Sequence, residues 1–270
     1  MNDHPRTVLV TGANRGLGRE TCRQLAALGM RVLLTARNET AGREAARALA
    51  AEVSAPASEQ APVEFLPLDV TDPESAGRLG DTLRAAGRAL DVLIHNAAVS
   101  ARGPRVEAAR DTLEVNYYGV IRVTDALLPS MAPAGHLVMV SSGLGSLAGV
   151  SASLRARFLA PDLSRDSLHG LLQEYLAELA RHNHTGAGWP SAPYNVSKIA
   201  LNALVRLLAP GLSDRNLRIN AVCPGWVRTD MGGPSAPRSV EEGARSIVLT
   251  AAPAEGPTGG IFRDGAAIDW

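Results

Sequence analysis

The chain has 270 residues, of which 46% are hydrophobic, and its 27 basic side chains balance its 27 acidic ones. This length suits one large α/β domain, and the balanced charge gives no reason to expect nucleic acid or an anionic membrane as a partner. Two cysteines provide no disulfide framework, and no stretch approaches the roughly 20 apolar residues that span a bilayer. Since the polar N-terminus also lacks the apolar core of a signal peptide, we expect a cytoplasmic protein.

Short apolar runs, which predict strands, alternate with helical patterns along the whole chain. The predicted strands cover residues 7–11, 31–36, 63–68, 91–95, 136–141, 218–222 and 259–262. Apolar strands that are separated by helices are typical of a parallel sheet covered on both faces. The sequence therefore predicts a single α/β domain over residues 1–270, built as a doubly wound, Rossmann-type parallel sheet of about seven strands flanked by helices.

A glycine-rich turn follows the first predicted strand. In the stretch TVLVTGANRGLG, Gly12, Gly16 and Gly18 lie between that strand and a helix. Glycines at this place permit a tight turn and let main-chain N–H groups approach a pyrophosphate, while the helix N-terminus adds the positive end of its dipole. Because the turn stands at the head of a βαβ series, it predicts a dinucleotide site.

The end of the second predicted strand indicates which dinucleotide binds. NAD-selective sites place a carboxylate there to hold the ribose hydroxyls, whereas this chain has Ala36 followed by Arg37. Arg15 lies in the glycine-rich turn as well, and two guanidinium groups can hold a 2′-phosphate, with no acid to repel it. We therefore expect a preference for NADPH; the alternative is two arginines that are merely exposed on the surface.

A long segment separates Ser142, at the end of the fifth predicted strand, from Tyr194. It spans 52 positions, far more than a loop needs. Within it, residues 166–182 carry an apolar stripe at helical spacing, formed by Leu168, Leu171, Leu172, Tyr175 and Leu179. We expect a helical insertion at about 147–190, which could also be packing without a functional role. His182 and His184 are interpreted as solvated loop residues, and we expect no metal site.

The segment SAPYNVSK places a tyrosine and a lysine four positions apart. On a helix, Tyr194 and Lys198 would share one face, so that the ammonium would favour the phenolate and lower a phenol pKa that is normally about 10. A phenol of lowered pKa is suited to donate a proton near neutral pH. The alternative is an amphipathic helix with a half-buried tyrosine and a solvated lysine.

Taken together, T-G-x-x-x-G-x-G at 11–18 and Y-x-x-x-K at 194–198 resemble the signature of the short-chain dehydrogenase/reductase family. The resemblance implies that Tyr194 donates a proton to a carbonyl oxygen and that Ser142 hydrogen-bonds the same oxygen. It further implies that Lys198 binds the nicotinamide ribose and lowers the pKa of Tyr194. Asn116 would then organise a water that links Lys198 to solvent.

The same resemblance implies the residues that bind NADP(H). Asp69 and Val70, after the third predicted strand, match the family's adenine-binding position, and HNAA at 95–98 matches the motif N-N-A-G in its second and third residues only. The segment at 224–229 resembles the turn that grips the nicotinamide end. The implied cofactor-binding residues are Gly12, Asn14, Arg15, Gly16, Leu17, Gly18, Arg37, Asp69, Val70, Asn96, Ala97, Tyr194, Lys198, Pro224, Gly225, Val227 and Thr229.

The long insertion narrows the resemblance to one branch of the family. The segments GWPSAPYNVSK and CPGWVRTDMGGP look like the monomeric carbonyl reductases, which reduce aldehydes and ketones with NADPH. In most family members the helices around the serine and the tyrosine form a tetramer interface, which a helical insertion would cover, so a monomer is expected. Trp226 is expected to form a wall of the substrate site beside Ser142 and Tyr194, with ordinary packing as the alternative.

The resemblance and the motifs together predict an NADPH-dependent enzyme that reduces aldehydes, ketones or quinones to alcohols. Its expected partner is a small carbonyl compound, with neither nucleic acid nor a membrane involved. Two alternatives are an oxidative alcohol dehydrogenase for one dedicated metabolite and a non-catalytic NADP(H) sensor. The sensor is less favoured because Asn116, Ser142, Tyr194 and Lys198 are all present.

Overall fold

The computed structural model describes residues 5–53, 62–101 and 103–270. Its centre is one sheet whose eight described strands follow the order β3-β2-β1-β4-β5-β6-β7-β8. The strands are β1 (Thr7–Val10), β2 (Arg31–Ala36), β3 (Val63–Pro67), β4 (Leu90–His95), β5 (Met131–Val140), β6 (Arg218–Val222), β7 (Ile261–Arg263) and β8 (Ala266–Ala267). All neighbours are parallel except β7 and β8.

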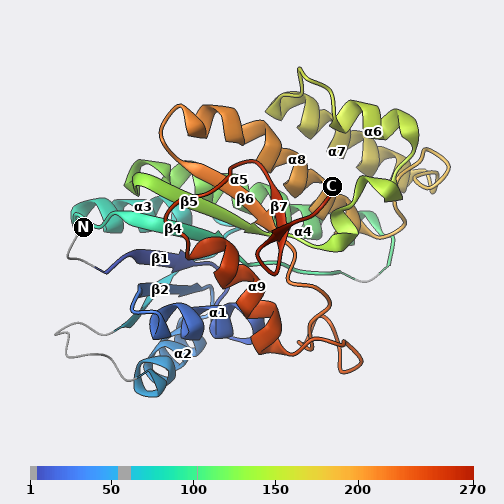
Figure 1. Ribbon diagram of the computed structural model, residues 1–270. Helices are drawn as coiled ribbons and strands as arrows, with labels where there is room; N and C mark the ends of the chain where they lie inside the picture. The colour runs from blue at the N-terminus through green and yellow to red at the C-terminus, as the bar shows by residue number, and fades with distance from the viewer. Residues whose placement is uncertain (1–4, 54–61, 102) are drawn as a thin grey trace.

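Helices lie on both faces of this sheet (Figure 1). The α-helices are α1 (Gly16–Ala27), α2 (Glu39–Glu52), α3 (Pro73–Ala85), α4 (Val106–Leu113), α5 (Gly119–Leu127), α6 (Ala152–Phe158), α7 (Arg165–Ala180), α8 (Pro193–Ser213) and α9 (Val240–Ala251). A π-helical turn, η1 (Glu114–Tyr118), joins α4 to α5, and three 3₁₀ turns, η2 (Leu128–Ser130), η3 (Gly143–Gly145) and η4 (Leu147–Gly149), flank β5.

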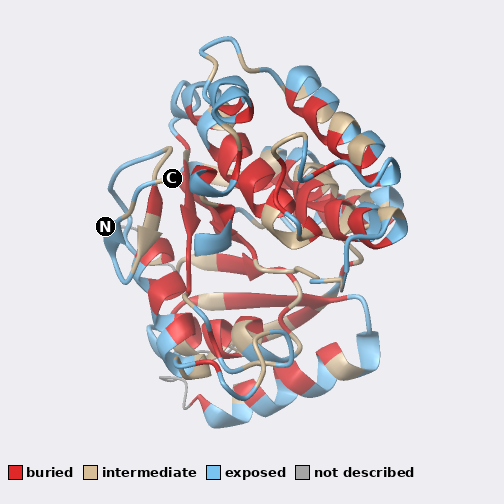
Figure 2. Ribbon diagram, turned by 90° about the vertical axis from the view of Figure 1, so that its right-hand side faces the viewer, coloured by how far each residue is buried: buried red, intermediate tan, exposed pale blue. Residues whose placement is uncertain are grey.

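The central strands are apolar on both sides because both faces of the sheet are buried. In β1, Val8 and Val10 belong to the apolar cluster that includes α1, α2 and α9, whereas Leu9 belongs to the larger cluster that includes α3, α5 and α8. Successive side chains of a strand point to opposite faces, so both clusters need apolar residues. Figure 2 shows the result: buried strands at the centre, with helices whose outer faces are exposed.

The predicted α/β class with a doubly wound sheet is confirmed, with one strand more than the seven expected. The additional strand, β8, is two exposed residues long, so no apolar run marks it in the sequence. It pairs with β7 through Asp264 and Gly265, whose φ angles are 52° and 81°. Asp-Gly is favoured in two-residue hairpin turns because both central residues need positive φ, so a signal for this hairpin was present.

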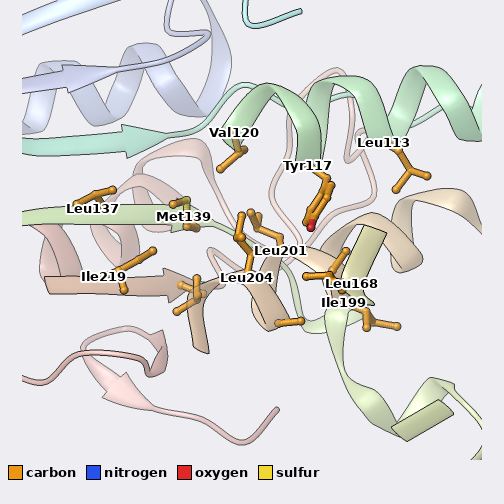
Figure 3. Packing of buried hydrophobic residues seen from close by; sticks show 14 of the residues in the cluster. Leu113, Tyr117, Val120, Leu137, Met139, Leu168, Ile199, Leu201, Leu204 and Ile219 are labelled. Atoms are coloured by element: carbon orange, nitrogen blue, oxygen red, sulfur yellow. The ribbon is translucent and has the colours of Figure 1, made fainter. Parts of the chain in front are cut away.

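The insertion between β5 and α8 contains α6 and α7, and α7 agrees with the helix predicted at 166–182 to within two residues. The predicted stripe on α7 is buried in the same cluster as the sheet and α8. Figure 3 shows part of this cluster, to which Leu168 of α7, Ile199 of α8 and Tyr117 of η1 all belong. Because insertion and sheet share one core, the packing supports the proposal of a single domain over the chain.

Ion pairs add to the attachment of the insertion. Arg157 of α6 pairs with Glu174 of α7 through both terminal nitrogens, at 2.9 and 2.6 Å. Arg165, at the start of α7, pairs in the same two-fold way with Asp125 of α5, at 2.9 and 3.0 Å. Bidentate geometry makes these stronger than ordinary surface pairs, so α7 is tied to both its neighbours.

The interpretation of two solvated histidines is right for His182 and wrong for His184. His182 is exposed, whereas the His184 side chain is only 8% exposed and lies edge-on to the ring of Tyr175, with 6.3 Å between centroids. The reason is that the segment after α7 folds back under Trp189, which also contacts Tyr175. A polar sequence around a histidine therefore did not mean exposure here.

One helix, α8, resembles a membrane span in its length and composition. Among the described residues, α8 alone is long and apolar enough to cross a bilayer, with a mean hydropathy of 1.2 over its best window, and 67% of that window is buried inside the protein. Such burial is typical of the core helix of a globular fold. Polar residues such as Asn195, Lys198 and Asn202 interrupt α8, so no unbroken apolar run marks it in the sequence.

Candidate active site

A cleft of about 1030 Å³ opens at the carboxyl ends of the strands. The strand order reverses between β1 and β4, and open α/β sheets bind ligands at such a switch point. The glycine-rich turn before α1 lines one end of the cleft, and the segment after β5 and the start of α8 line the other. The segment after β6 reaches both ends, since its Asp230 pairs with Arg15 of the glycine-rich turn.

At the first end, the glycine-rich turn has no room for side chains. A Cβ on Gly12, where φ is +64°, would lie 2.8 Å from the Cα of Ala97, and one on Gly18 would lie 2.4 Å from the amide nitrogen of Asn96. Asn96 donates from that nitrogen to the carbonyls of Thr11 and Gly12, at 2.9 and 3.1 Å. Asn96 thus fixes the turn, and Ala97 sets how closely the turn packs.

The N-terminus of α1 faces the cleft at this turn. Its N-cap residue, Arg15, makes no side-chain capping bond, and the first turn contains no acidic residue. Gly16, Leu17 and Gly18 of that first turn line the cleft. The free N–H groups and the positive end of the helix dipole can therefore accept an anion such as a pyrophosphate.

Arg37 and Asp69 lie beyond this turn, past the ends of β2 and β3. Arg37 is exposed. Burial opposes ionisation of Asp69, but hydrogen bonds from Thr71 and the charges of Arg37 and Arg122 prevail and hold the pKa of Asp69 below its ordinary value. The ends of β2 and β3 are therefore followed by a cation, Arg37, and by a carboxylate, Asp69, that stays ionised. Neither residue lines the main cleft.

Arg15 has a partner that the sequence did not predict. Its guanidinium pairs with the carboxylate of Asp230, from the segment after β6, and its side chain is 72% exposed. The expectation that no acid lies near the predicted phosphate-binding arginines is therefore wrong for Arg15. An ion pair this exposed is weak, so Arg15 can exchange Asp230 for a phosphate at little cost.

At the second end of the cleft, Ser142, Tyr194 and Lys198 come together. Ser142 lies two residues after the end of β5, and Tyr194 lies in the first turn of α8. The Ser142 hydroxyl acts on the Tyr194 phenol and favours a lower pKa, against the effect of burial. Lys198 follows one turn later, with its Nζ 5.4 Å from the centroid of the Tyr194 ring. The spacing of four residues thus puts both groups on one face, as predicted.

Lys198, the only lysine in the sequence, is nevertheless buried and not solvated. Its Nζ donates to the carbonyl of Val140 at the end of β5, at 2.7 Å. Burial disfavours the ammonium and lowers the pKa of Lys198 to about 8. This excludes the alternative in which Lys198 is a surface charge.

The predicted acidification of Tyr194 is wrong. Burial raises the pKa of Tyr194 to about 12, although the bond from Ser142 works in the opposite direction. Two physical reasons account for this: the phenolate is poorly solvated at the helix start, and the Lys198 ammonium is directed at a carbonyl instead of the phenol oxygen. Tyr194 is therefore firmly protonated.

Asn116 lies in the π-helical turn η1 and connects the segment after β4 to α8. Its amide oxygen accepts from the N–H of Val99 at 2.8 Å, and its amide nitrogen donates to the carbonyl of Val99 and to the Ser197 hydroxyl, at 2.9 and 3.0 Å. The Ser197 hydroxyl in turn donates to the Tyr194 carbonyl at 2.7 Å. Asn116 thus supports the helix turn that carries Tyr194. Single π turns are frequent at functional sites.

The segment after β6 forms the floor of this end. Pro224, Gly225, Val227 and Thr229 all line the cleft. Gly225 has a φ of +84°, and a Cβ there would lie 2.5 Å from the side chain of Arg238, so this turn also depends on glycine. Of the implied cofactor-binding residues, Asn14, Arg37, Asp69, Val70 and Ala97 do not line the main cleft, and neither does Asn116.

The mouth of the cleft is apolar. Trp226 is 57% exposed, lines the cleft and donates from its indole nitrogen to the carbonyl of Gly232 at 2.8 Å. Leu144 and Met231, also exposed, line the same mouth. Trp226 is therefore not an ordinary packing residue, and an apolar ligand could cover these side chains.

Four residues of the site were not found from the sequence. Cys223 accepts hydrogen bonds from the Gly143 N–H at 3.0 Å and from Arg263 Nη2 at 2.9 Å. Asn202 and the indole of Trp270 both donate to the carbonyl of Gly145, at 3.1 and 2.8 Å, and hold the turn after Ser142. Asn202 lies one turn beyond Lys198 on the same face of α8, so helical spacing in the sequence could have indicated it. No motif or spacing in the sequence indicates Arg263 or Trp270.

Comparisons with known proteins agree with this geometry. The sequence matches the family description "short chain dehydrogenase" over residues 6–154 and "Enoyl-(Acyl carrier protein) reductase" over residues 176–252. It is 36% identical to carbonyl reductase (NADPH) 1 of Sus scrofa over 287 positions, covering 100% of this chain and 96% of the relative.

Two solved structures are similar over nearly their whole length. The structure of salutaridine reductase from Papaver somniferum superposes with a TM-score of 0.87 at 30% identity, covering 95% of this chain and 99% of that one. NADPH-bound carbonyl reductase from chicken fatty liver gives a TM-score of 0.72 at 25% identity, covering 99% and 100%.

Proposed function

The chain is an oxidoreductase of the short-chain dehydrogenase/reductase family, related to NADPH-dependent carbonyl reductases, and we propose that it reduces aldehydes, ketones or quinones to alcohols with NADPH. The observation that carries the proposal is the convergence of Ser142, Tyr194 and the buried Lys198 at one end of the cleft. Two hydroxyls that can donate to one oxygen atom suit a carbonyl group that gains negative charge.

The residues at the other end of the cleft fit a dinucleotide. Gly12 and Gly18 leave no space for a Cβ, so ligand atoms can approach the main chain, and the first turn of α1 offers free N–H groups. Arg37, with Arg15 released from Asp230, supplies positive charge for a 2′-phosphate, which supports NADPH over NADH. When bound, the cofactor supplies a hydride to the carbonyl carbon.

We assign the proton donation to Tyr194. Its raised pKa keeps the phenol protonated at neutral pH, so the proton is available when charge develops on the carbonyl oxygen. Ser142 hydrogen-bonds the same oxygen and holds the carbonyl in line. Lys198, with a pKa of about 8, is mostly charged at neutral pH and would exchange the Val140 carbonyl for the ribose hydroxyls, which brings its charge to bear on Tyr194.

Asn116 is assigned two tasks. It holds the first turn of α8 through Ser197, and it would organise the water that returns protons from solvent to Lys198. The relatives named as NADPH carbonyl reductases favour reduction over the oxidative alternative, and membership of an oxidoreductase family leaves no observation in favour of a non-catalytic sensor.

The Tyr194→Phe variant tests this function. Without the phenol hydroxyl, we expect turnover of simple aldehydes and ketones to fall by a factor on the order of 10² to 10⁴, while NADPH still binds. NADPH absorbance measures turnover, and quenching or transfer of its fluorescence measures binding. Tyr175→Phe is the matched control, since the buried Tyr175 hydroxyl has no hydrogen-bond partner among the described residues and lies outside the cleft. Turnover of Tyr194→Phe equal to that of the control would refute the assignment.

We also propose a cytoplasmic monomer. α7 covers α4 and α8 with its apolar stripe and is tied to α5 by the Arg165–Asp125 pair, so the face that serves as a tetramer contact in other family members is occupied by the chain itself. Light scattering at assay concentration tests this, and a stable tetramer would contradict it.

A further inference from the structure

Arg263, the last residue of β7, places a guanidinium group in the substrate end of the cleft. It lines the cleft together with Ser142 and Tyr194. Its Nη2 donates to the Cys223 thiol at 2.9 Å, and a Cβ on Gly143, the residue after Ser142, would lie 3.0 Å from the same nitrogen. The charge therefore stands beside the turn that carries the serine.

The other arginines of the cleft already have acceptors. Arg15 pairs with Asp230. Arg238 donates to both carboxylate oxygens of Asp264, at 3.0 and 2.7 Å. Arg228 donates to the carbonyls of Ala236 and Pro237, at 3.0 and 2.8 Å. Asp230 is the only acidic residue among those that line the cleft in the described chain. Arg263 forms no ion pair with any described residue, and its neighbour Asp264 is taken by Arg238.

The hydrogen-bonding capacity of the Arg263 guanidinium is also largely unused within the described chain. Its Nε is buried and unpartnered within the described chain, and the thiol that Nη2 meets is a weak acceptor. A buried donor without a partner is costly, and the planar fork of a guanidinium matches a carboxylate through two parallel bonds. Arg263 can therefore bind an anion, and no carboxylate of the described chain occupies that place.

The residues that line the cleft near Arg263 indicate the chemistry of the rest of such a ligand. Leu144, Trp226 and Met231 form the apolar mouth of the cleft, at the same end as Arg263. Because Ser142, Tyr194 and Arg263 line the same cleft, a ligand with an oxygen at the two hydroxyls has a place for a polar end at Arg263. The site thus combines an apolar wall, a carbonyl-binding pair and one uncompensated cation.

We propose that Arg263 binds an anionic group of the substrate, so that the preferred substrates are apolar carbonyl compounds that carry a carboxylate. This inference rests on the proposed carbonyl reduction and names its substrate class. The chemistry is unchanged: the hydride goes to the carbonyl carbon, the proton of Tyr194 goes to its oxygen, and the carboxylate takes no part in the step. Arg263 is then a specificity residue.

A competing role for Arg263 makes a different prediction. If the guanidinium served only to hold the Cys223 thiol and the turn after Ser142, its loss would affect charged and neutral substrates alike. The ratio of kcat/KM for an acid over its neutral ester separates the two roles, because general damage to the site cancels in that ratio.

The experiment compares three aryl keto acids, 3-benzoylpropionate, 4-benzoylbutyrate and 5-benzoylvalerate, with their methyl esters. Methylene groups insulate the carboxylate from the ketone, so acid and ester have similar intrinsic reactivity, and the chain length measures the reach to Arg263. The variants at the site are Arg263→Gln and Arg263→Lys. The matched control is Arg245→Gln, which removes one charge from the exposed surface of α9.

We expect the wild type to prefer at least one acid over its ester by a factor on the order of ten to a hundred. Arg263→Gln should lose most of this preference, Arg263→Lys should keep part of it because the charge remains, and Arg245→Gln should keep all of it. A preference that survives in Arg263→Gln, or a wild type that favours the ester at every chain length, overturns the inference and leaves carbonyl reduction intact. A wild type that reduces neither acids, esters nor simple aldehydes overturns the proposed function as well.

A second measurement uses the wild type alone, in case Arg263→Gln does not fold. Against a neutral aldehyde substrate, 4-phenylbutyrate should inhibit at a concentration about tenfold lower than the matched amide, 4-phenylbutyramide, because only the acid pairs with the guanidinium. Equal inhibition by the two compounds overturns the inference.

Discussion

The two ends of the cleft are built by opposite means. At the cofactor end, one continuous turn, residues 11–18, works through missing side chains: Gly12 and Gly18 leave the main chain bare. At the proposed substrate end, Ser142, Tyr194 and Arg263 come from separate segments and would work through polar side chains that are each half-buried. The first end should therefore tolerate no added volume, whereas the second should tolerate no change of charge.

The largest effect should follow from removing the charge at the substrate end with Lys198→Met. The variant keeps the volume of the side chain but can neither hold ribose hydroxyls nor assist Tyr194, so we expect turnover to fall by a factor on the order of 10² to 10⁴. NADPH oxidation with an aldehyde substrate measures this. Activity close to that of the wild type would show that the buried charge is not needed.

The same variant also carries a pH signature. Burial lowers the pKa of Lys198 from 10.5 to about 8, so between these values the unfolded chain binds more protons than the folded one. The stability of the wild type relative to Lys198→Met should therefore rise as the pH increases from about 8 to 10.5 and stay level below 8. Denaturant unfolding at several pH values tests this, and a difference that does not change with pH would contradict the burial of the charge.

A smaller effect is expected from added volume at the cofactor end. In Gly18→Ala the new methyl group would meet the Asn96 amide at 2.4 Å and the main chain of Ala13 and Gly12 at 2.9 Å. Such overpacking costs about 1–3 kcal/mol of folding stability. Because the turn must also shift away from the position in which its main chain would meet the cofactor, we expect NADPH affinity to fall roughly ten- to a hundredfold. The control is Gly77→Ala in α3, where nothing lies within 4 Å and alanine favours the helix. Equal NADPH affinity in the two variants would contradict the tight turn.

The smallest effect concerns charge at the edge of the cofactor end. Arg37→Gln should weaken NADPH about tenfold and leave NADH nearly unchanged, because only the 2′-phosphate needs the guanidinium. Arg15→Gln should do less, since Arg15 is already shared with Asp230. The ratio of kcat/KM for the two cofactors measures both, with Arg47→Gln on the exposed side of α2 as control. A wild type that uses NADH as well as NADPH would contradict the assignment.

The same contrast explains what could be predicted from the sequence. The cofactor end depends on neighbours along the chain, so its glycines, the strand before them and the helix after them could all be identified. Tyr194 and Lys198 could be paired because helix geometry relates positions four apart. The partner of Lys198 could not, because the Val140 carbonyl is 58 residues away and only the assembled sheet brings it near.

The errors have one physical cause. The pKa of Tyr194 and the exposure of His184 depend on burial, which is decided by segments far apart in the chain. Arg263 and Trp270 reach the site from the last strands, where the sequence has short elements and weak patterns. Local motifs therefore identified the groups that we propose to react, whereas their protonation and the cation that we propose to select substrates are visible only in the folded chain.

The isolation of Lys198 has a practical consequence. Because every other basic side chain in the sequence is arginine or histidine, Lys198 carries the only ε-amine, and it lies inside the cleft. Acylating reagents that decorate most proteins at many places would find one side-chain amine here, screened by bound nucleotide. Mass spectrometry after acylation would thus report occupancy of the cleft directly, and immobilisation through side-chain amines would have to be replaced by another attachment chemistry.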